Sequence, residues 1–265
     1  MSNGRTRAAA SASDPVHEIT DLTQALNLTA LTDQIPALLQ RAEKDGLSYS
    51  DFTLELLRHE AQSRNSRRLT RNLKRSGLPV VIEPLETFDF SARPQLEPRV
   101  VKELLNCRWV EEEGRNIICV GRAGLGKSRV LDNLGDAACR RGYTILKVIT
   151  AEMLEDLHAS FADGTFKRTF RRYEKPDVLF LEEFGYAPFD EAATKYLFRL
   201  ISARHRQRSI LLAANTGFKN WKRFFPSEAQ AVATVDRLID KASILRFTGK
   251  SFRDPKEILG AETED

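Results

Sequence analysis

The sequence predicts a three-layer α/β domain with a largely parallel sheet, preceded by a small all-helical domain. From residue 100 onward, short apolar segments alternate with helical stretches, an order typical of a sheet with helices on both faces. Between residues 17 and 78 the apolar residues recur at near-helical spacing instead. We therefore divide the chain into a tail over 1–16, a helical domain over 17–80, a connector over 81–99, an α/β domain over 100–256 and a tail over 257–265.

The helical domain is predicted from its leucines and from the residues that interrupt them. Leucines recur at helical spacing between residues 22 and 39, and Asp45-Gly46 then breaks the pattern. A long helix is expected to follow, with Ser50 or Asp51 as its N-cap, and to stop at Gly77-Leu78-Pro79. The connector after it carries three prolines between residues 84 and 98, which suits an extended segment lying against the α/β domain.

Five apolar segments supply the strands of the α/β domain, and helical stretches separate most of them. Because parallel strands need crossover connections, this alternation favours a parallel sheet. We expect the strands at residues 116–120, 144–149, 178–181, 209–214 and 244–247.

Composition excludes several classes of protein. The three cysteines show no CxxC spacing and the four histidines are scattered, so neither set indicates a metal site, and the thiols suit a reducing, cytoplasmic location. No apolar run approaches the roughly 20 residues that span a bilayer, so we expect no membrane association. The first residues contain arginines without the apolar segment of a secretory signal.

A phosphate-binding loop is the strongest motif in the chain. An apolar strand runs into residues 121–128, which satisfy GxxxxGK[ST], and a helix over 130–139 follows. Glycines let backbone amides cradle phosphate oxygens, and the helix N-terminus adds positive charge. Lys127 is expected to reach the β- and γ-phosphates of ATP, and Ser128 to bind Mg²⁺. The predicted nucleotide contacts are Gly121, Arg122, Ala123, Gly124, Leu125, Gly126, Lys127, Ser128 and Arg129.

Two acidic residues follow the predicted strand over 178–181. Glu182 would hold Mg²⁺, and Glu183 would orient and polarise the attacking water. Two glutamates can also simply begin a solvated loop after a core strand. Their position about 55 residues beyond the phosphate-binding loop favours the functional interpretation.

Two further polar residues are candidates for the site. Asn215 ends the predicted strand over 209–214 and could hydrogen-bond the γ-phosphate or the attacking water, although asparagine at a strand end is also a common turn former. Arg237 could act as an arginine finger donated to the ATP of a neighbouring subunit. An ordinary pair with Asp236 or Asp240 is the alternative for Arg237.

Three basic runs make nucleic acid a candidate partner. From residue 58 to 75 the chain carries seven Lys or Arg against one Glu, a second run precedes the strand at 178, and a third lies at Arg204, Arg206 and Arg208. A solvated helix face explains any single run equally well. The residues expected to contact DNA phosphates are Arg64, Arg67, Arg68, Arg71, Lys74, Arg75, Lys167, Arg168, Arg171 and Arg172.

The chain resembles the IstB-like transposition helper ATPases, relatives of the DnaC helicase loaders within the AAA+ class. The phosphate-binding loop, LEEFGYAPFD at residues 181–190, the strand ending in Asn215, residues 235–238 and the GKSFR segment that includes Phe252 and Arg253 carry this resemblance. SYSDFTLELLRHE, GLP and LETFDF extend it into the helical domain and the connector, so that it covers about residues 20–255.

The resemblance implies a fold and a function. Members of this family assemble as homo-oligomeric rings or helical filaments on duplex DNA, with ATP at the subunit interfaces. They distort that DNA and recruit or stimulate a cognate transposase. It implies an AAA+ sheet of order 5-1-4-3-2, which would bring Lys127, Asn215 and Glu183 around one γ-phosphate. It also implies that Phe88 and Phe90 lie near the nucleotide base or the domain junction, although core packing explains both aromatics as well.

Three positions depart from the family pattern. Glu182 replaces the usual aspartate, and because Mg²⁺ tolerates little geometric error, hydrolysis could be slow. Arg122-Ala123 stands where Pro-Pro is usual, and Ala213-Ala214 precedes Asn215 where small hydroxyl residues are common. Two alternatives to a transposition helper therefore stay open: a replicative helicase loader of the DnaC type, and a weakly hydrolysing, nucleotide-gated assembly module.

Overall fold

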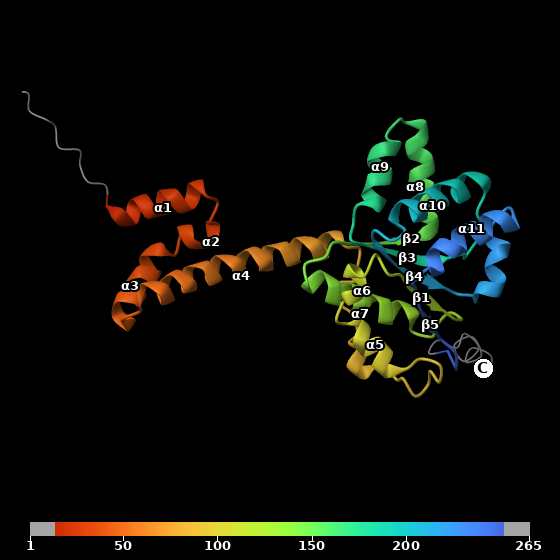
Figure 1. The fold of residues 1–265 in the computed structure, drawn as a ribbon, viewed down its shortest axis with the longest axis horizontal. Helices are drawn as coiled ribbons and strands as arrows, with labels where there is room; N and C mark the ends of the chain where they lie inside the picture. Colours follow the sequence, from red (N-terminus) through yellow and green to blue (C-terminus); the bar gives the residue numbers. More distant parts are fainter. Residues whose placement is uncertain (1–13, 252–265) are drawn as a thin grey trace, which may run out of the picture. The chain divides into compact units, whose positions relative to one another are not determined.

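The computed structural model describes residues 14–251, which belong to two compact units over Met1–Arg68 and Leu69–Asp265 (Figure 1). The expected tail over 257–265, most of the tail over 1–16, and Phe252 and Arg253 of the GKSFR segment lie outside the described residues. No helix within the described residues combines the length and the apolar character that crossing a membrane requires.

The first unit consists of helices. It contains α1 (Pro15–Ala25), α2 (Thr29–Thr32), α3 (Ile35–Asp45) and most of α4 (Tyr49–Arg75). Leu31 and Ile35 are buried, and the carboxylate of Glu60 on α4 is buried with them. Glu60 accepts hydrogen bonds from the amide of Ala30 at 3.0 Å and from Nε of Arg64 at 2.6 Å, so its charge is paired inside the unit.

The start of α4 differs from the prediction and its end agrees. The helix begins at Tyr49, and its capping residue is Ser48 rather than Ser50 or Asp51. Ser48 Oγ accepts the amide of Asp51 at 3.1 Å and donates to the Asp51 carboxylate at 2.6 Å, a reciprocal pair that places Asp51 inside the first turn. The helix ends before Gly77, whose φ of 72° favours glycine.

The second unit contains a five-stranded parallel sheet in the order β2-β3-β4-β1-β5. Read from the other edge, this is the predicted order 5-1-4-3-2, which is therefore confirmed. The strands are β1 (Ile117–Val120), β2 (Ile145–Ile149), β3 (Val178–Phe184), β4 (Ser209–Ala214) and β5 (Ser243–Arg246). The expected end of β3 at residue 181 is wrong, because the strand continues through the acidic pair.

Helices cover both faces of the sheet and complete three layers (Figure 1). Ile117 and Cys119 point into one core, and Ile118 and Val120 point into the other, as the alternation along a strand requires. The first core lies under η1 (Leu85–Thr87), α5 (Pro98–Leu104), α6 (Arg108–Glu111) and α7 (Lys127–Arg140). The second lies under α8 (Thr150–Ala162), α9 (Phe166–Glu174), α10 (Glu191–Arg204), η2 (Phe218–Phe224) and α11 (Glu228–Ile239).

The connector belongs to the first of these cores. Leu85, Phe88 and Leu96 are buried in it beside residues of β1 and α7. Burying these apolar side chains holds a segment with little regular structure against the sheet unit. The connector thus packs against the α/β domain through these side chains.

The third basic run is mostly structural. Arg204 is only 1% exposed, and its guanidinium donates to five backbone carbonyls, those of Tyr173, Glu174, Pro176, Asp177 and Ser209. These carbonyls lie before β3 and at the start of β4, so the arginine ties the amino ends of two strands together. Arg206 pairs with Asp240 at 2.8 Å, and Arg208 donates to the carbonyl of Glu174. The expectation that Arg204 contacts nucleic acid as part of the third basic run is therefore wrong.

Replacing Arg204 with alanine should lower the free energy of unfolding by about 3 kcal/mol or more, because several buried carbonyls lose their donor. Arg206→Ala is the matched control in the same run. Its side chain is 55% exposed, so the loss of its ion pair should lower the free energy of unfolding far less than the loss of Arg204 does. Urea unfolding of both variants measures the difference, and equal effects would refute the structural role of Arg204.

Candidate nucleotide-binding site

The phosphate-binding loop leaves the sheet at the end of β1, which lies between β4 and β5. Gly121 donates its amide to the carbonyl of Ala214 on β4 at 3.2 Å, and on the other side Phe247 donates to the carbonyl of Val120 at 2.8 Å. A Cβ atom at Gly121 would lie 2.3 Å from the carbonyl oxygen of Phe247. Glycine is therefore required at the point where the loop begins.

The end of the loop is packed against the connector. Gly126 has a φ of 88° and immediately precedes α7, and a Cβ atom there would lie 2.6 Å from the ring of Phe88. Arg93, which is 1% exposed, donates through Nε to the carbonyl of Leu125 at 2.9 Å and through Nη1 to that of Lys250 at 2.8 Å. Phe88 and Arg93 thus fix the loop from the connector side. Arg93 gave no sequence signal, because an isolated arginine in a proline-rich segment fits any surface loop.

Lys127 is buried at the centre of the loop. Its side chain donates to the carbonyls of Gly121 and Arg122 at 2.7 and 2.8 Å, and the residue is 6% exposed. Burial lowers the pKa of the Lys127 ammonium to about 8, and the negative charge of Glu182 opposes this shift only in part. The ammonium is held by neutral carbonyls, so an anion at the loop would supply the countercharge that it lacks.

The carboxyl ends of three neighbouring parallel strands bring the predicted catalytic residues to one edge of the sheet. Lys127 follows β1, Asn215 follows β4, and Glu183 lies near the end of β3, with β4 between the other two strands. The register shifts between Leu181 and Phe184, and Glu183 has a φ of 55°, so the acidic pair forms a bulge. Glu183 is exposed and Asn215 is half-buried at this edge.

Glu182 lies inside an ion-pair network that the sequence did not reveal. Its Oε2 atom is 2.9 Å from Nζ of Lys147 on β2, and the same Nζ is 2.9 Å from Oδ1 of Asp132 on α7. Burial alone would lower the pKa of Lys147, but hydrogen bonds to Asp132 and Glu182 outweigh it and raise the pKa. A charged residue in the middle of an otherwise apolar strand was the only available signal.

The donor set suits Mg²⁺ in chemical type. The hydroxyl of Ser128 in the first turn of α7 and the carboxylate of Glu182 are hard oxygen ligands, and Oε1 of Glu182 accepts no hydrogen bond from the described residues. These two groups would hold the ion, and the ion would neutralise phosphate charge.

Several other residues of the loop were predicted to contact the nucleotide. In the structure their side chains either contact other parts of the protein or face solvent. Arg129 pairs with Glu83 at 2.9 Å and donates to the carbonyl of Pro84, so its guanidinium fastens the connector to α7. Arg122 and Ala123 are exposed at the rim of the loop. Gly124 has a φ of 75°, which permits the turn of the backbone.

Arg237 lies apart from the loop. Its guanidinium stacks 4.6 Å from the centre of the Phe198 ring on α10 and donates to the carbonyl of Ala233 one turn earlier on α11. Within residues 14–251 it forms no ion pair with Asp236 or Asp240, and Asp240 is engaged by His205 and Arg206. The intrachain pair considered as an alternative is therefore absent from the described structure.

The second unit contains a basic groove of about 1060 Å³ between the end of α4 and α9. It joins two runs that are far apart in the sequence, because Arg75 and the basic residues of α9 face the same space. All its charged side chains are cationic and exposed; they are those of Arg75, Lys167, Arg168, Arg171, Arg172 and Lys175. Asn72, Pro176 and residues 144–146 at the start of β2 complete the wall.

The remaining predicted DNA contacts differ in their surroundings. Arg64 and Arg67 pair with the buried Glu60 at 2.6 and 3.6 Å, although both side chains are about half exposed. Arg68, Arg71 and Lys74 are exposed along α4. The structure thus gathers only Arg75 and the α9 residues of the predicted set into one groove.

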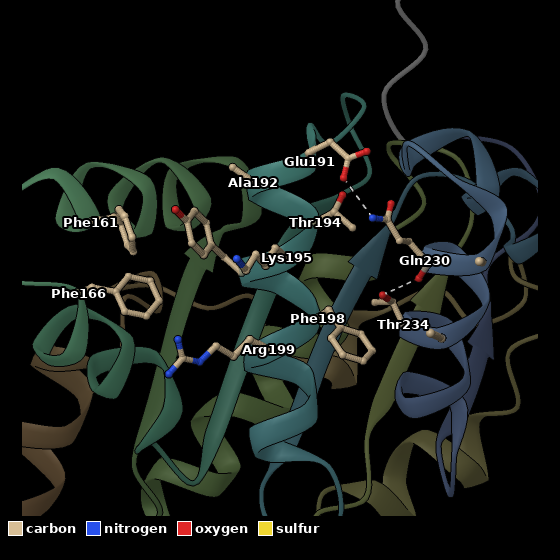
Figure 2. A pocket seen from close by; sticks show the side chains of 13 residues that line it. Phe161, Phe166, Glu191, Ala192, Thr194, Lys195, Phe198, Arg199, Gln230 and Thr234 are labelled. Atoms are coloured by element: carbon tan, nitrogen blue, oxygen red, sulfur yellow. Dashed lines mark hydrogen bonds between the residues drawn. The ribbon is translucent and has the colours of Figure 1, made fainter.

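A second cavity, of about 820 Å³, is largely apolar and lies along α10 (Figure 2). Phe161 and Phe166 lie on one side of α10, and Gln230 and Thr234 of α11 lie on the other, where Gln230 donates to Glu191 at 3.2 Å. The phosphate-binding loop and the acidic pair contribute no residue to this cavity. It is therefore separate from the nucleotide site.

The sequence matches a family model described as IstB-like ATP binding protein over residues 21–259. Among curated proteins, it is 31% identical to the predicted ATP-binding protein of insertion sequence IS21 from Pseudomonas aeruginosa, over 90% of this chain and 89% of the relative. It is 29% identical to the corresponding protein of insertion sequence IS5376 from Geobacillus stearothermophilus, over 90% and 94% of the two chains.

Solved structures confirm the fold. A structure of DnaI is similar with a TM-score of 0.52 and 18% identity, over 64% of this chain and 89% of that chain. A structure of the replication initiator DnaA, bound to AMPPCP and single-stranded DNA, gives a TM-score of 0.53 and 18% identity, over 66% and 52% of the two chains. The sheet order and these similarities identify an AAA+ P-loop fold. With the loop, the acidic pair and the family match together, the chain belongs to the IstB-like ATP-binding proteins of insertion sequences.

Proposed function

We propose that this protein is an ATP-dependent DNA-binding helper of transposition, which oligomerises on duplex DNA, remodels it and recruits or stimulates a cognate transposase. The observation that carries the proposal is the single sheet edge that holds Lys127, Asn215 and Glu183, in a chain of a family found in insertion sequences. ATP hydrolysis at this edge would control assembly and release.

Each residue of the edge has a defined task in the proposed reaction. Lys127 exchanges its two carbonyl partners for phosphate oxygens and offsets their negative charge. Glu183 orients and polarises the attacking water, and its exposed position lets water reach it. Asn215 hydrogen-bonds the γ-phosphate or that water from the central strand β4.

The basic groove supports DNA as the polymer that is bound. Six exposed cations line the groove, and among the described residues only Arg172 of these six forms an ion pair, with Asp156 at 3.4 Å. Such a surface favours a polyanion and carries little sequence information. The phosphates of one duplex strand match such a surface, and affinity built from phosphate contacts falls steeply with salt.

Reversing charge in the groove tests DNA binding. The double variant Lys167→Glu/Arg171→Glu should weaken binding to a random duplex at least about tenfold at about 100 mM salt and flatten the salt dependence, since several phosphate contacts are lost. Its affinity for ATP should not change. Fluorescence anisotropy with labelled DNA measures the effect.

Arg99→Glu/Lys102→Glu on α5 is the matched control, because it alters net charge equally on exposed residues outside the groove. Equal loss in both variants would refute the groove as the DNA site. Tighter binding to single strands than to duplex would favour a helicase loader instead.

We also propose that Arg237 acts on the ATP of a neighbouring subunit. Its guanidinium is held by a ring and a carbonyl rather than by a carboxylate, so its charge is available to an anion from another molecule. An arginine finger of this kind stabilises charge in the transition state for phosphoryl transfer.

Mixing two inactive variants tests a shared site. Arg237→Ala subunits should lack the finger, and Lys127→Ala subunits should bind ATP weakly and lack the cation of the loop, so each alone should hydrolyse ATP poorly. A mixture on DNA should recover part of the ATPase rate, because an intact loop then meets an intact Arg237 from a neighbour. A mixture as inactive as its components would contradict the proposed role of Arg237.

The ion pair of Glu182 with Lys147 favours a second candidate, the weakly hydrolysing assembly module. In that function nucleotide binding alone would control assembly on DNA. The steady-state ATPase rate with and without DNA separates the two functions: stimulation by DNA supports the hydrolysing helper, and a negligible rate in both conditions supports the module.

A further inference from the structure

Three charged side chains from three elements meet on the α7 face of the sheet. Lys147 Nζ lies 2.9 Å from Asp132 Oδ1 and 2.9 Å from Glu182 Oε2, and also 4.9 Å from the centre of the Phe180 ring. The side chains of Lys147 and Asp132 are 13% and 10% exposed, and that of Glu182 is 23% exposed. Charges this sheltered from water interact strongly, so the arrangement constrains all three.

The register of the strands explains why these residues meet. Ile145 and Phe180 face the core under α7, and Lys147 and Glu182 follow them two residues later on the neighbouring strands β2 and β3. Asp132 projects from α7 to the same side. A glutamate at position 182 is long enough to reach the ammonium of Lys147 across the strand pair.

The network fixes the position of the Glu182 carboxylate relative to Ser128. Asp132 follows Ser128 by four residues, so it lies on the same face of α7 about one helical turn, or roughly 6 Å, farther from the loop. Lys147 binds Glu182 Oε2 and Asp132 Oδ1 at once, and this keeps the Glu182 carboxylate beside Asp132 instead of free to follow an ion at Ser128.

We propose that Lys147 and Asp132 are positioning residues that restrain Glu182, so that Mg²⁺ contributes little to nucleotide affinity in this protein while the network is intact. The inference rests on the proposed nucleotide site. Mg²⁺ requires ligands in a nearly ideal octahedron at short distance, and a carboxylate with one oxygen fixed on an ammonium adapts poorly to that requirement. Loss of an outer partner that orients a metal ligand commonly lowers metal affinity by 10- to 100-fold. Lys147 instead holds the ligand away from the ion, so its loss should act in the opposite direction.

The test compares nucleotide affinity with Mg²⁺ and with EDTA, using a fluorescent ATP analogue. In the unaltered protein Mg²⁺ should improve affinity by less than about threefold. Lys147→Met/Asp132→Asn removes the restraint and keeps the net charge, since one cation and one anion are lost together. This double variant should raise the Mg²⁺-dependent gain to at least about tenfold and leave the affinity in EDTA within about twofold.

Glu182→Asp provides an independent variant that leaves the Lys147–Asp132 pair in place. The shorter side chain loses its reach to Lys147, so the Mg²⁺-dependent gain should also increase. Thermal unfolding checks that both variants are folded, and Glu182→Asp decides alone if the double variant is not. A merely structural network would change the melting temperature without changing the gain.

An unchanged or smaller Mg²⁺-dependent gain in folded variants would overturn the inference. A large gain in the unaltered protein would overturn it too. Failure of the unaltered protein to bind the analogue in either condition would contradict the proposed nucleotide site itself.

Discussion

The buried ammonium of Lys127 is the constraint around which the site is built. A lysine this sheltered from water needs oxygen partners, and the loop supplies two carbonyls from its own first residues. That arrangement requires the loop to close tightly, which in turn requires glycine at positions 121 and 126. Phe88 and Arg93 press the connector against the loop, so the same constraint accounts for the packing of a segment with little regular structure.

The charged side chains at the carboxyl-terminal edge of the sheet fall into separate groups. Lys127 meets the loop carbonyls, Lys147 meets Asp132 and Glu182, and Glu183 remains exposed beside Asn215. A polyphosphate would therefore bind near Lys127, whose partners are neutral carbonyls. The charge of Lys147 is already neutralised by two carboxylates. This division separates nucleotide binding, which depends on Lys127, from metal ligation, which depends on how firmly Lys147 holds Glu182.

Much of the fold and the loop could be predicted from the sequence, because local patterns encode them. Strand positions follow from apolar runs, and the loop follows from glycines between a strand and a helix. The buried roles of Arg204 and Lys147 could not, because both depend on distant partners. Four of the five carbonyls that Arg204 binds lie 27 to 31 residues earlier in the chain. Lys147 pairs with Asp132, 15 residues earlier, and with Glu182 on the neighbouring strand. The cap at Ser48 was missed because several polar residues compete at that helix start.

Equilibrium binding of ATP to the Lys127→Ala protein measures whether the buried ammonium holds the nucleotide. Removing the ammonium deletes a charge-assisted contact that contributes about 1.5–3 kcal/mol, so affinity should fall by at least about tenfold. Lys219→Ala, which changes an exposed lysine of η2, is the control and should bind as the unaltered protein does. Full affinity for ATP in the Lys127→Ala protein would contradict the account.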